Sequence, residues 1–273
     1  MDKFKFLIII KGMNVYEWEK ISDFAADFRA GISIGSFDGI HLGHRTLLKV
    51  LVSACKEKNL KSGIITFSRP LPSIKHSDDY DGDLSTLRQR LLGFESLGID
   101  FVVVVDFNEA FAQTTGSDFL LKLKNTFNMK FLAEGIDFRC GYKGATDSQA
   151  IKYFCENNNV EYNFVEPVYF DNGGEEERVS SSFIRKMIIK GYFSTVQNLL
   201  TKPYQLDFSE INSDGIAEQN KKVIIDRKEV FQVLPKDGVY HLKNAQREDV
   251  RMEITNDTLI FTPSDDFFPL LNF

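Results

Sequence analysis

A glycine-rich stretch from Gly35 to His44, with the sequence GSFDGIHLGH, carries the residue types best suited to chemistry in this chain. It follows a short apolar run and precedes an amphipathic stretch, so we predict a turn between a buried strand and a helix. Gly35, Gly39 and Gly43 allow a ligand to approach the backbone closely. The free N–H groups at the start of the helix favour a phosphate group there.

Two histidines occupy this turn. His41 and His44 are three residues apart, so they share one face at the start of the predicted helix. Their imidazoles can donate hydrogen bonds to phosphoryl oxygens and stabilise the charge that develops during displacement at phosphorus. Two of the four histidines in the chain fall in this single turn. The pattern therefore favours a functional role for them over the alternative that they are ordinary polar loop residues.

A second candidate phosphate site lies at Ser180, Ser181 and Ser182, where another helix is predicted to begin. Serine hydroxyls and free N–H groups at a helix start can bind phosphate oxygens. Arg185 follows one turn later and could make a bidentate contact to a phosphate. The alternative is a plain serine cap followed by a solvated arginine.

Between about residues 31 and 168, apolar runs alternate with amphipathic stretches. This alternation predicts an α/β fold, a right-handed doubly wound parallel sheet with helices on both faces. The predicted strands cover residues 31–35, 64–67, 101–107, 131–133 and 162–168. The predicted helices cover residues 45–59, 84–97, 118–127, 148–157, 181–190 and 193–200. In such a sheet, ligands bind beyond the carboxyl ends of the strands.

The sequence changes character after Pro203, where short strand-like runs are separated by turn residues. These runs cover residues 223–225, 230–234, 238–242, 250–254 and 258–262. They predict a small antiparallel barrel or sheet. We therefore expect two domains, residues 1–203 and residues 204–273.

The Gly35–His44 stretch resembles the extended histidine motif of the bacterial FAD synthetases (FMN adenylyltransferases), which usually form part of a bifunctional riboflavin kinase/FAD synthetase. Three further segments resemble motifs of that family in the family's order, and the resemblance covers roughly residues 31–203. They are residues 106–112 with Asp118 and Phe119, residues 135–141 with Gly144, and residues 178–185. The resemblance implies a Rossmann-like fold of the nucleotidylyltransferase type.

The resemblance also implies an activity, the transfer of AMP from ATP to FMN to give FAD and pyrophosphate by direct in-line displacement. The residues that it places at the reaction are His41, His44 and Arg185. Those that it places around ATP and its phosphates are Gly35, Ser36, Phe37, Asp38, Gly39, Gly43, Ser181 and Ser182. Those that it places near the flavin or the nucleotide are Phe67, Asp137, Phe138 and Arg139. Magnesium is expected with the ATP phosphates, and no protein ligand is assigned to it.

Some of these residues have an equally plausible packing role. Phe67 could flank a flavin ring or could be a core aromatic at a strand end. Asp137 could hydrogen-bond a ribose, the ribityl chain or the adenine amino group, or could be an ordinary turn residue. The sequence also departs from the family pattern, with Cys140 in place of the usual Phe and residues 68–72 in place of Glu-Pro-His-Pro.

The riboflavin kinase motif of the bifunctional family, Gly-x-Pro-Thr-Ala-Asn, does not occur after Pro203. We therefore expect the C-terminal part to be a truncated kinase-like barrel without kinase activity. The alternatives are a nucleotidylyltransferase with another phosphorylated acceptor and a non-catalytic relative that binds flavin or nucleotide. Residues 31–35 also fit the Gly-x-Ser-x-Gly pattern of serine hydrolases, but Ser33 falls inside the predicted strand rather than on a turn.

The composition of the chain limits the classes of binding partner that we expect. The net charge of −6 gives no electrostatic case for nucleic acid or an anionic membrane. The apolar run at residues 6–10 is too short for a signal peptide or a membrane helix. Cys55, Cys140 and Cys155 are widely spaced and form no zinc or disulfide framework, which suits a reducing cytoplasm. The sequence leaves the oligomeric state open.

Overall fold

The computed structural model describes residues 12–23, 26–71, 80–171, 173–211, 215–219, 222–262 and 270–273. The apolar run at residues 6–10 lies outside them. The chain divides into two compact units, one formed by residues 1–75 and 90–168 and the other by residues 76–89 and 169–273. The domain boundary expected at residue 203 lies within the second unit and stays a prediction.

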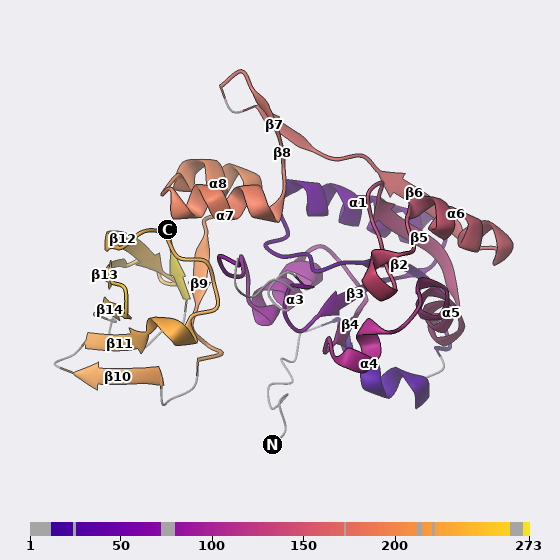
Figure 1. The fold of residues 1–273 in the computed structure, drawn as a ribbon, viewed down its shortest axis with the longest axis horizontal. Coiled ribbons are helices and arrows are strands. Elements are labelled where there is room, and N and C mark those ends of the chain that lie inside the picture. Colours follow the sequence, from indigo (N-terminus) through magenta and orange to yellow (C-terminus); the bar gives the residue numbers. More distant parts are fainter. Residues whose placement is uncertain are drawn as a thin grey trace. The chain divides into compact units, whose positions relative to one another are not determined.

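The first unit is built on a parallel sheet of six strands in the order β1-β4-β3-β2-β5-β6. Figure 1 labels β2 to β6 of this sheet. The strands are β1 (Asn14–Glu17), β2 (Ala30–Ile34), β3 (Lys61–Phe67), β4 (Phe101–Val105), β5 (Met129–Gly135) and β6 (Glu161–Val165). Every residue of β2 and β4 is buried, as expected for β-branched runs covered on both faces. The α/β prediction is confirmed, although the edge strand β1 was not predicted.

Helices connect these strands. They are η1 (Trp18–Asp23), α1 (Leu42–Glu57), α3 (Leu87–Ser96), α4 (Glu109–Ala112), α5 (Gly116–Phe127), η3 (Tyr142–Gly144) and α6 (Ser148–Asn157). Right-handed crossovers place α1 and α3 on one face of the sheet and α5 and α6 on the other. The core on the α5 and α6 face includes Ile32, Phe101, Leu120, Leu132 and Ile151. The predicted bounds of α6 agree with the structure, whereas α1 begins three residues earlier than expected.

The chain order of the strands reverses at β2. From β2 the chain continues to β3 and β4 on one side, and it later fills the other side of β2 with β5 and β6. The carboxyl ends of β2 and β5 therefore flank a topological switch point, where open α/β sheets bind ligands. The Gly35–His44 stretch follows β2 directly.

The second unit contains an antiparallel sheet of seven strands in the order β10-β11-β14-β13-β12-β15-β9. The strands are β9 (Gln205–Asp207), β10 (Ile216–Gln219), β11 (Lys222–Asp226), β12 (Gly238–Asn244), β13 (Asp249–Ile254), β14 (Thr258–Phe261) and β15 (Leu270–Asn272). The remaining elements are β7 (Tyr169–Asp171), β8 (Glu176–Arg178), α7 (Ser181–Ile189), α8 (Phe193–Leu200) and η5 (Arg227–Glu229). The small C-terminal β domain is thus confirmed as a sheet.

One strand prediction in this unit is wrong. Residues 230–234 form no strand, and Gln232 makes only an isolated bridge to Asp83. The N–H of Val233 donates to the Asp83 carbonyl (2.9 Å), and the N–H of Asp83 donates to the Phe231 carbonyl (2.7 Å). This apolar run is extended because it pairs with a segment about 150 residues earlier in the chain, which no local pattern could reveal.

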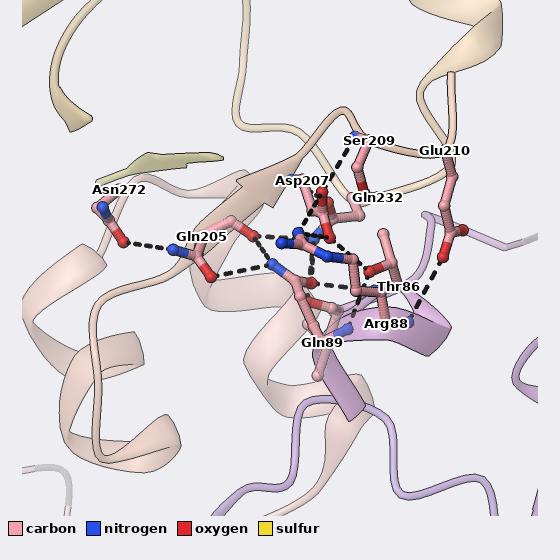
Figure 2. Close-up of polar contacts among 10 residues, drawn as sticks. Thr86, Arg88, Gln89, Gln205, Asp207, Ser209, Glu210, Gln232 and Asn272 are labelled. Atoms are coloured by element: carbon pink, nitrogen blue, oxygen red, sulfur yellow. Dashed lines mark hydrogen bonds and ion pairs between the residues drawn. The ribbon is translucent and has the colours of Figure 1, made fainter. Parts of the chain in front are cut away.

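A buried polar network fastens residues 84–89 to the C-terminal sheet (Figure 2). The carboxylate of Asp207 accepts hydrogen bonds from the Thr86 hydroxyl (2.9 Å), Nη1 of Arg88 (3.2 Å) and the N–H of Ser209 (3.0 Å). Thr86 and Gln89 also bond reciprocally through side chain and backbone, which forms a capping box at the start of α3. The Asp207 side chain is fully buried, so its hydrogen bonds stabilise the unit strongly.

Replacing Asp207 with Ala should destabilise the second unit. Arg88 loses its buried counter-charge and Thr86 its acceptor, so we expect the free energy of unfolding to fall by about 3 kcal/mol. Urea unfolding measures this change. The matched control is Asp249→Ala, which removes an exposed ion pair with Lys243 and should change little. Equal unfolding midpoints for the two variants would contradict the role given to Asp207.

Candidate functional site

The turn after β2 is the centre of the candidate site. Gly35 continues the sheet, because its N–H donates to the Ile65 carbonyl (3.0 Å). The chain then turns through residues 36–40 and enters α1 at Leu42. The first N–H groups of α1 therefore lie at the carboxyl end of β2, where the sequence predicted a phosphate site.

The turn contains strained backbone. Phe37 (φ 48°) and Ile40 (φ 44°) adopt left-handed conformations, as does Gly39 (φ 82°). Such conformations cost about 1–3 kcal/mol at a non-glycine residue, and they are particularly unfavourable for β-branched Ile40. Both side chains are buried, and Phe37 packs edge-on against Phe94 of α3 (5.6 Å between ring centroids). Packing therefore keeps the turn in a shape that the local sequence does not favour.

The two histidines stack on each other at the start of α1. Their ring centroids are 3.7 Å apart and the planes differ by 17°. His41 is the N-cap of α1, and its Nδ1 accepts the N–H of His44 (3.4 Å). A neutral His41 that accepts at Nδ1 carries its proton on Nε2. The sequence prediction that both imidazoles share a face is confirmed by this stacking.

Burial controls the protonation of His44. Its Nδ1 is buried, with no hydrogen-bond partner among the described residues, and the ring of Phe37 lies edge-on to it (5.3 Å). Burial lowers the pKa of His44 well below its ordinary value, and the neighbouring His41 lowers it further. His44 is therefore neutral near pH 7, and its ring can act there as a hydrogen-bond donor but not as a cation.

A buried carboxyl lies on the other side of the switch point. Glu134, near the end of β5, is 1% exposed, and its Oε1 accepts the N–H of Ile34 (2.6 Å). Burial raises the pKa of Glu134 well above its ordinary value, although the Ile34 N–H opposes the shift. Glu134 thus holds the last residue of β2, beyond the point where β2 and β5 stop pairing. No sequence pattern pointed to this residue.

The loop after β5 carries the second group of predicted residues. Asp137 and Arg139 are exposed, whereas Phe138 packs partly against the core. Nε of Arg139 donates to the Gly144 carbonyl (2.7 Å), which fixes this side chain across the loop. Gly141 (φ 76°) lies so close to Gly116 that a Cβ would fall 2.2 Å from its backbone nitrogen. Glycine is therefore required at Gly141 on both conformational and packing grounds.

The third neighbouring strand, β3, ends at Phe67. This ring is 5% exposed and packs edge-on against Phe107 and Phe111. The structure thus gives Phe67 a packing role, and a contact with flavin stays a prediction. Because β3, β2 and β5 are adjacent, Phe67, the Gly35–His44 turn and the Asp137 loop all follow the carboxyl ends of neighbouring strands.

Ser181, Ser182 and Arg185 belong to the second unit, where they lie on α7. Ser180 caps the helix by accepting the N–H of Phe183 (3.2 Å). Arg185 is buried, and it donates from Nε to the Gly82 carbonyl (2.6 Å) and from Nη2 to the Tyr80 hydroxyl (2.8 Å). The alternative of a solvated arginine is therefore wrong, because the guanidinium is held by protein groups.

No three side chains of His, Cys, Asp or Glu among the residues that the structure describes gather closely enough to hold a metal ion. No helix among the described elements has the length and apolar character needed to cross a membrane.

His44 should make stability depend on pH. The folded protein keeps the ring neutral, while the unfolded chain binds a proton below about pH 6.5. The free energy of unfolding should therefore fall as the pH drops below this value, by at most about 1.4 kcal/mol per pH unit from this group. His44→Gln removes this contribution to the pH dependence. Chemical unfolding at about pH 7.5 and at about pH 5.5 would measure the free energy of unfolding of each variant. The control is exposed His241→Gln, and equal pH slopes for His44→Gln and the unmodified chain would contradict the neutral ring.

Glu134 should make the free energy of unfolding depend on pH in the opposite direction from His44. The unfolded chain loses the carboxyl proton above about pH 4.3, whereas burial holds the proton in the folded protein to a higher pH. The free energy of unfolding therefore falls as the pH rises from about 4.3 towards the folded pKa. Glu134→Gln keeps an oxygen acceptor for Ile34 and cannot ionise. It should be more stable than the unmodified chain at about pH 8, by a margin that shrinks towards about pH 5. Glu134→Ala lacks the acceptor and should be less stable than Glu134→Gln throughout, and a reversed order would contradict this role.

Comparisons with known proteins agree with this geometry. A family model described as FAD synthetase matches residues 25–183, more than half of the chain. The FAD synthetase of Listeria monocytogenes is 26% identical over 235 residues, which cover 86% of this chain and 87% of that protein. The bifunctional riboflavin kinase/FMN adenylyltransferase of Escherichia coli K12 is 29% identical over 216 residues, which cover 77% of this chain and 66% of that protein.

The chain thus spans about two thirds of the length of the Escherichia coli enzyme. Among solved structures, the crystal structure described as a macrolide-efflux protein from Streptococcus pneumoniae matches with a TM-score of 0.74 and 20% identity. That match covers 95% of this chain and 97% of the other, and it shows a shared fold. Together with the Gly35–His44, Gly135–Gly141 and Arg178–Arg185 motifs, the match over residues 25–183 shows that the chain belongs to the FAD synthetase family.

Proposed function

We propose that this chain transfers the adenylyl group of ATP to FMN, which yields FAD and pyrophosphate. An oxygen of the FMN phosphate forms a bond to the α-phosphorus of ATP. The bond from this phosphorus to the oxygen bridging to the β-phosphorus breaks, and pyrophosphate leaves with that electron pair. The protein needs only to position the reactants and stabilise charge.

The observation that carries the proposal is the turn at the switch point. Stacked His41 and His44 lie at the start of a 16-residue helix, whose free N–H groups and dipole attract phosphate. Both rings belong to the first unit. A phosphate bound at this helix start would be within reach of imidazole donors, which supports adenylyl transfer over a purely structural role.

The histidines act in this proposal as hydrogen-bond donors. The neutral His44 donates to an oxygen of the α-phosphate, on which negative charge grows in the transition state. His41 donates from Nε2, since its Nδ1 accepts the N–H of His44. The residues from Gly35 to Gly39, together with Gly43, let the triphosphate approach the backbone.

The leaving pyrophosphate is assigned to α7. Ser181 and Ser182 occupy its first two helical positions, and serine hydroxyls and backbone N–H groups at a helix start can bind phosphate oxygens. Arg185 supplies positive charge, and its bonds to Gly82 and Tyr80 fix the orientation of its guanidinium. ATP enters as its magnesium complex, with the metal held by phosphate oxygens and water.

The flavin and nucleotide rings are assigned to the loops after β3 and β5. Exposed Asp137 is a hydrogen-bond acceptor for a ribose, the ribityl chain or the adenine amino group. Phe138 offers a partly buried aromatic surface, and Arg139 is held across the same loop. Phe67 supports this edge of the sheet from within the aromatic cluster.

The proposal assigns no riboflavin kinase activity to the C-terminal sheet, because the kinase motif is missing from its sequence. It also places the enzyme in the cytoplasm. All three cysteines are free and buried, and burial raises the pKa of Cys55 to about 11 and that of Cys140 to about 12. Such thiols react slowly, which is compatible with a reducing compartment.

The purified chain should form FAD and pyrophosphate from FMN, ATP and magnesium. Chromatographic identification of the flavin product tests this directly. A parallel reaction with riboflavin should give no FMN, and substantial FMN would contradict the proposed absence of kinase activity. A panel of other phosphorylated acceptors tests the broader alternative, and a faster reaction with any of them would overturn the assignment to FMN.

Replacing His44 with Ala should lower kcat by about 100- to 1,000-fold, the range typical for a donor to developing charge. Circular dichroism should show an unchanged fold. His241→Ala is the matched control, because His241 is an exposed histidine of the C-terminal sheet and should retain full activity. Near-normal FAD formation by His44→Ala would exclude the proposed role.

A further inference from the structure

A fully buried arginine contacts the candidate site without being part of any motif described above. Arg90, on α3, is 1% exposed and is among the largest fully buried side chains of the chain. Burying a guanidinium is costly unless its N–H groups are hydrogen-bonded. The hydrogen bonds of the Arg90 guanidinium therefore indicate which part of the structure its burial stabilises.

Four hydrogen bonds of Arg90 lead to two segments of the first unit. Nη1 donates to the carbonyls of Ser36 (3.1 Å) and Phe67 (2.9 Å) and to the hydroxyl of Thr66 (3.0 Å). Nη2 donates to the carbonyl of Ser68 (3.0 Å). One planar group thus joins the second residue of the Gly35–His44 turn to the end of β3.

The same two segments are joined by direct bonds. The Thr66 hydroxyl donates to the Ser36 carbonyl (3.3 Å), which closes a triangle with Nη1 of Arg90. The Ser36 hydroxyl accepts the N–H of Leu71 (3.2 Å). Arg90 therefore lies at the centre of a polar cluster that fixes where the turn leaves β2.

The face of α3 that carries Arg90 also supports the strained part of the turn. Phe94 is four residues after Arg90 and hence on the same face, and it packs against Phe37. Between them, Gly93 lies so close to Ile40 that a Cβ would fall 2.5 Å from its Cδ1. One helix face thus holds Ser36, Phe37 and Ile40, of which the last two are left-handed.

We propose that Arg90 is a positioning residue for adenylyl transfer, because its guanidinium holds the strained Gly35–His44 turn in the shape that presents His41 and His44. This inference rests on the function proposed above. Arg90 would act through the turn and would not touch the substrate. Lysine cannot replace it fully. A single ammonium group lacks the planar, forked set of N–H donors with which the guanidinium bonds both the Ser36 carbonyl and the end of β3.

The test compares Arg90→Met and Arg90→Lys with Leu91→Ala. Leu91 is the next residue of α3 and is buried, but an alanine there removes only apolar packing. Two quantities are measured at a temperature at which every variant is folded. The first is the set of imidazole NMR signals of the four histidines, and the second is kcat with the KM values for ATP and FMN.

In Arg90→Met, the NMR signals of His41 and His44 should shift, while the signal of His241 stays in place. The kcat value should fall by about 100-fold, as expected when catalytic groups are misplaced by about 1 Å. The KM values should change far less than kcat. Arg90→Lys should show the same changes to a smaller extent, which keeps the test decisive if Arg90→Met does not fold. Leu91→Ala should lower the melting temperature and leave both the histidine signals and kcat unchanged.

The proposal is overturned if Arg90→Met or Arg90→Lys keeps the unmodified histidine signals and kcat, or if Leu91→Ala changes them equally. The NMR measurement needs no activity, so it separates this inference from the function on which it rests. If the unmodified chain makes no FAD, the proposed function fails. The histidine signals would then still show whether Arg90 holds the turn.

Discussion

Left-handed backbone at Phe37 and Ile40 is the constraint on which the candidate site depends. The conformation is unfavourable for both residues, so the turn keeps its shape only while its surroundings hold it. α3 packs against it through Phe94 and Gly93. This arrangement sets the direction in which the chain enters α1, and with it the position of the stacked histidines and of the free N–H groups at the helix start.

Two buried ionisable residues support the turn from opposite sides of β2. Glu134 holds the N–H of Ile34 before the turn, and Arg90 holds the carbonyl of Ser36 within it. Burying either group opposes folding unless its hydrogen bonds are satisfied. The site proposed for the triphosphate thus depends on polar groups placed inside the core, where apolar residues would pack more easily.

The C-terminal sheet lacks the kinase motif, yet it has a well-ordered interior of its own. Asp207, Gln232 and Gln89 form a buried network that includes the capping box at the start of α3 (Figure 2). Residues 80–89 consequently group with a sheet that begins more than a hundred residues later. The buried side chains of Asp207, Gln232 and Gln89 find hydrogen-bond partners within this unit, which stabilises its fold without the kinase sequence.

The sequence alone determined the α/β architecture, the turn and the histidine pair. Hydrophobic periodicity is a local signal, so it located β2 to β6 and the bounds of α6 and α8, while residue spacing placed His41 and His44 on one face. The tertiary structure alone decided the burial and the hydrogen-bond partners of Arg90, Glu134 and Arg185. It also revealed the edge strand β1 and the pairing of Gln232 with Asp83. A charged side chain is stable in a core only with partners from distant segments, and strand pairing likewise depends on distant partners, so neither can be read from neighbours along the chain.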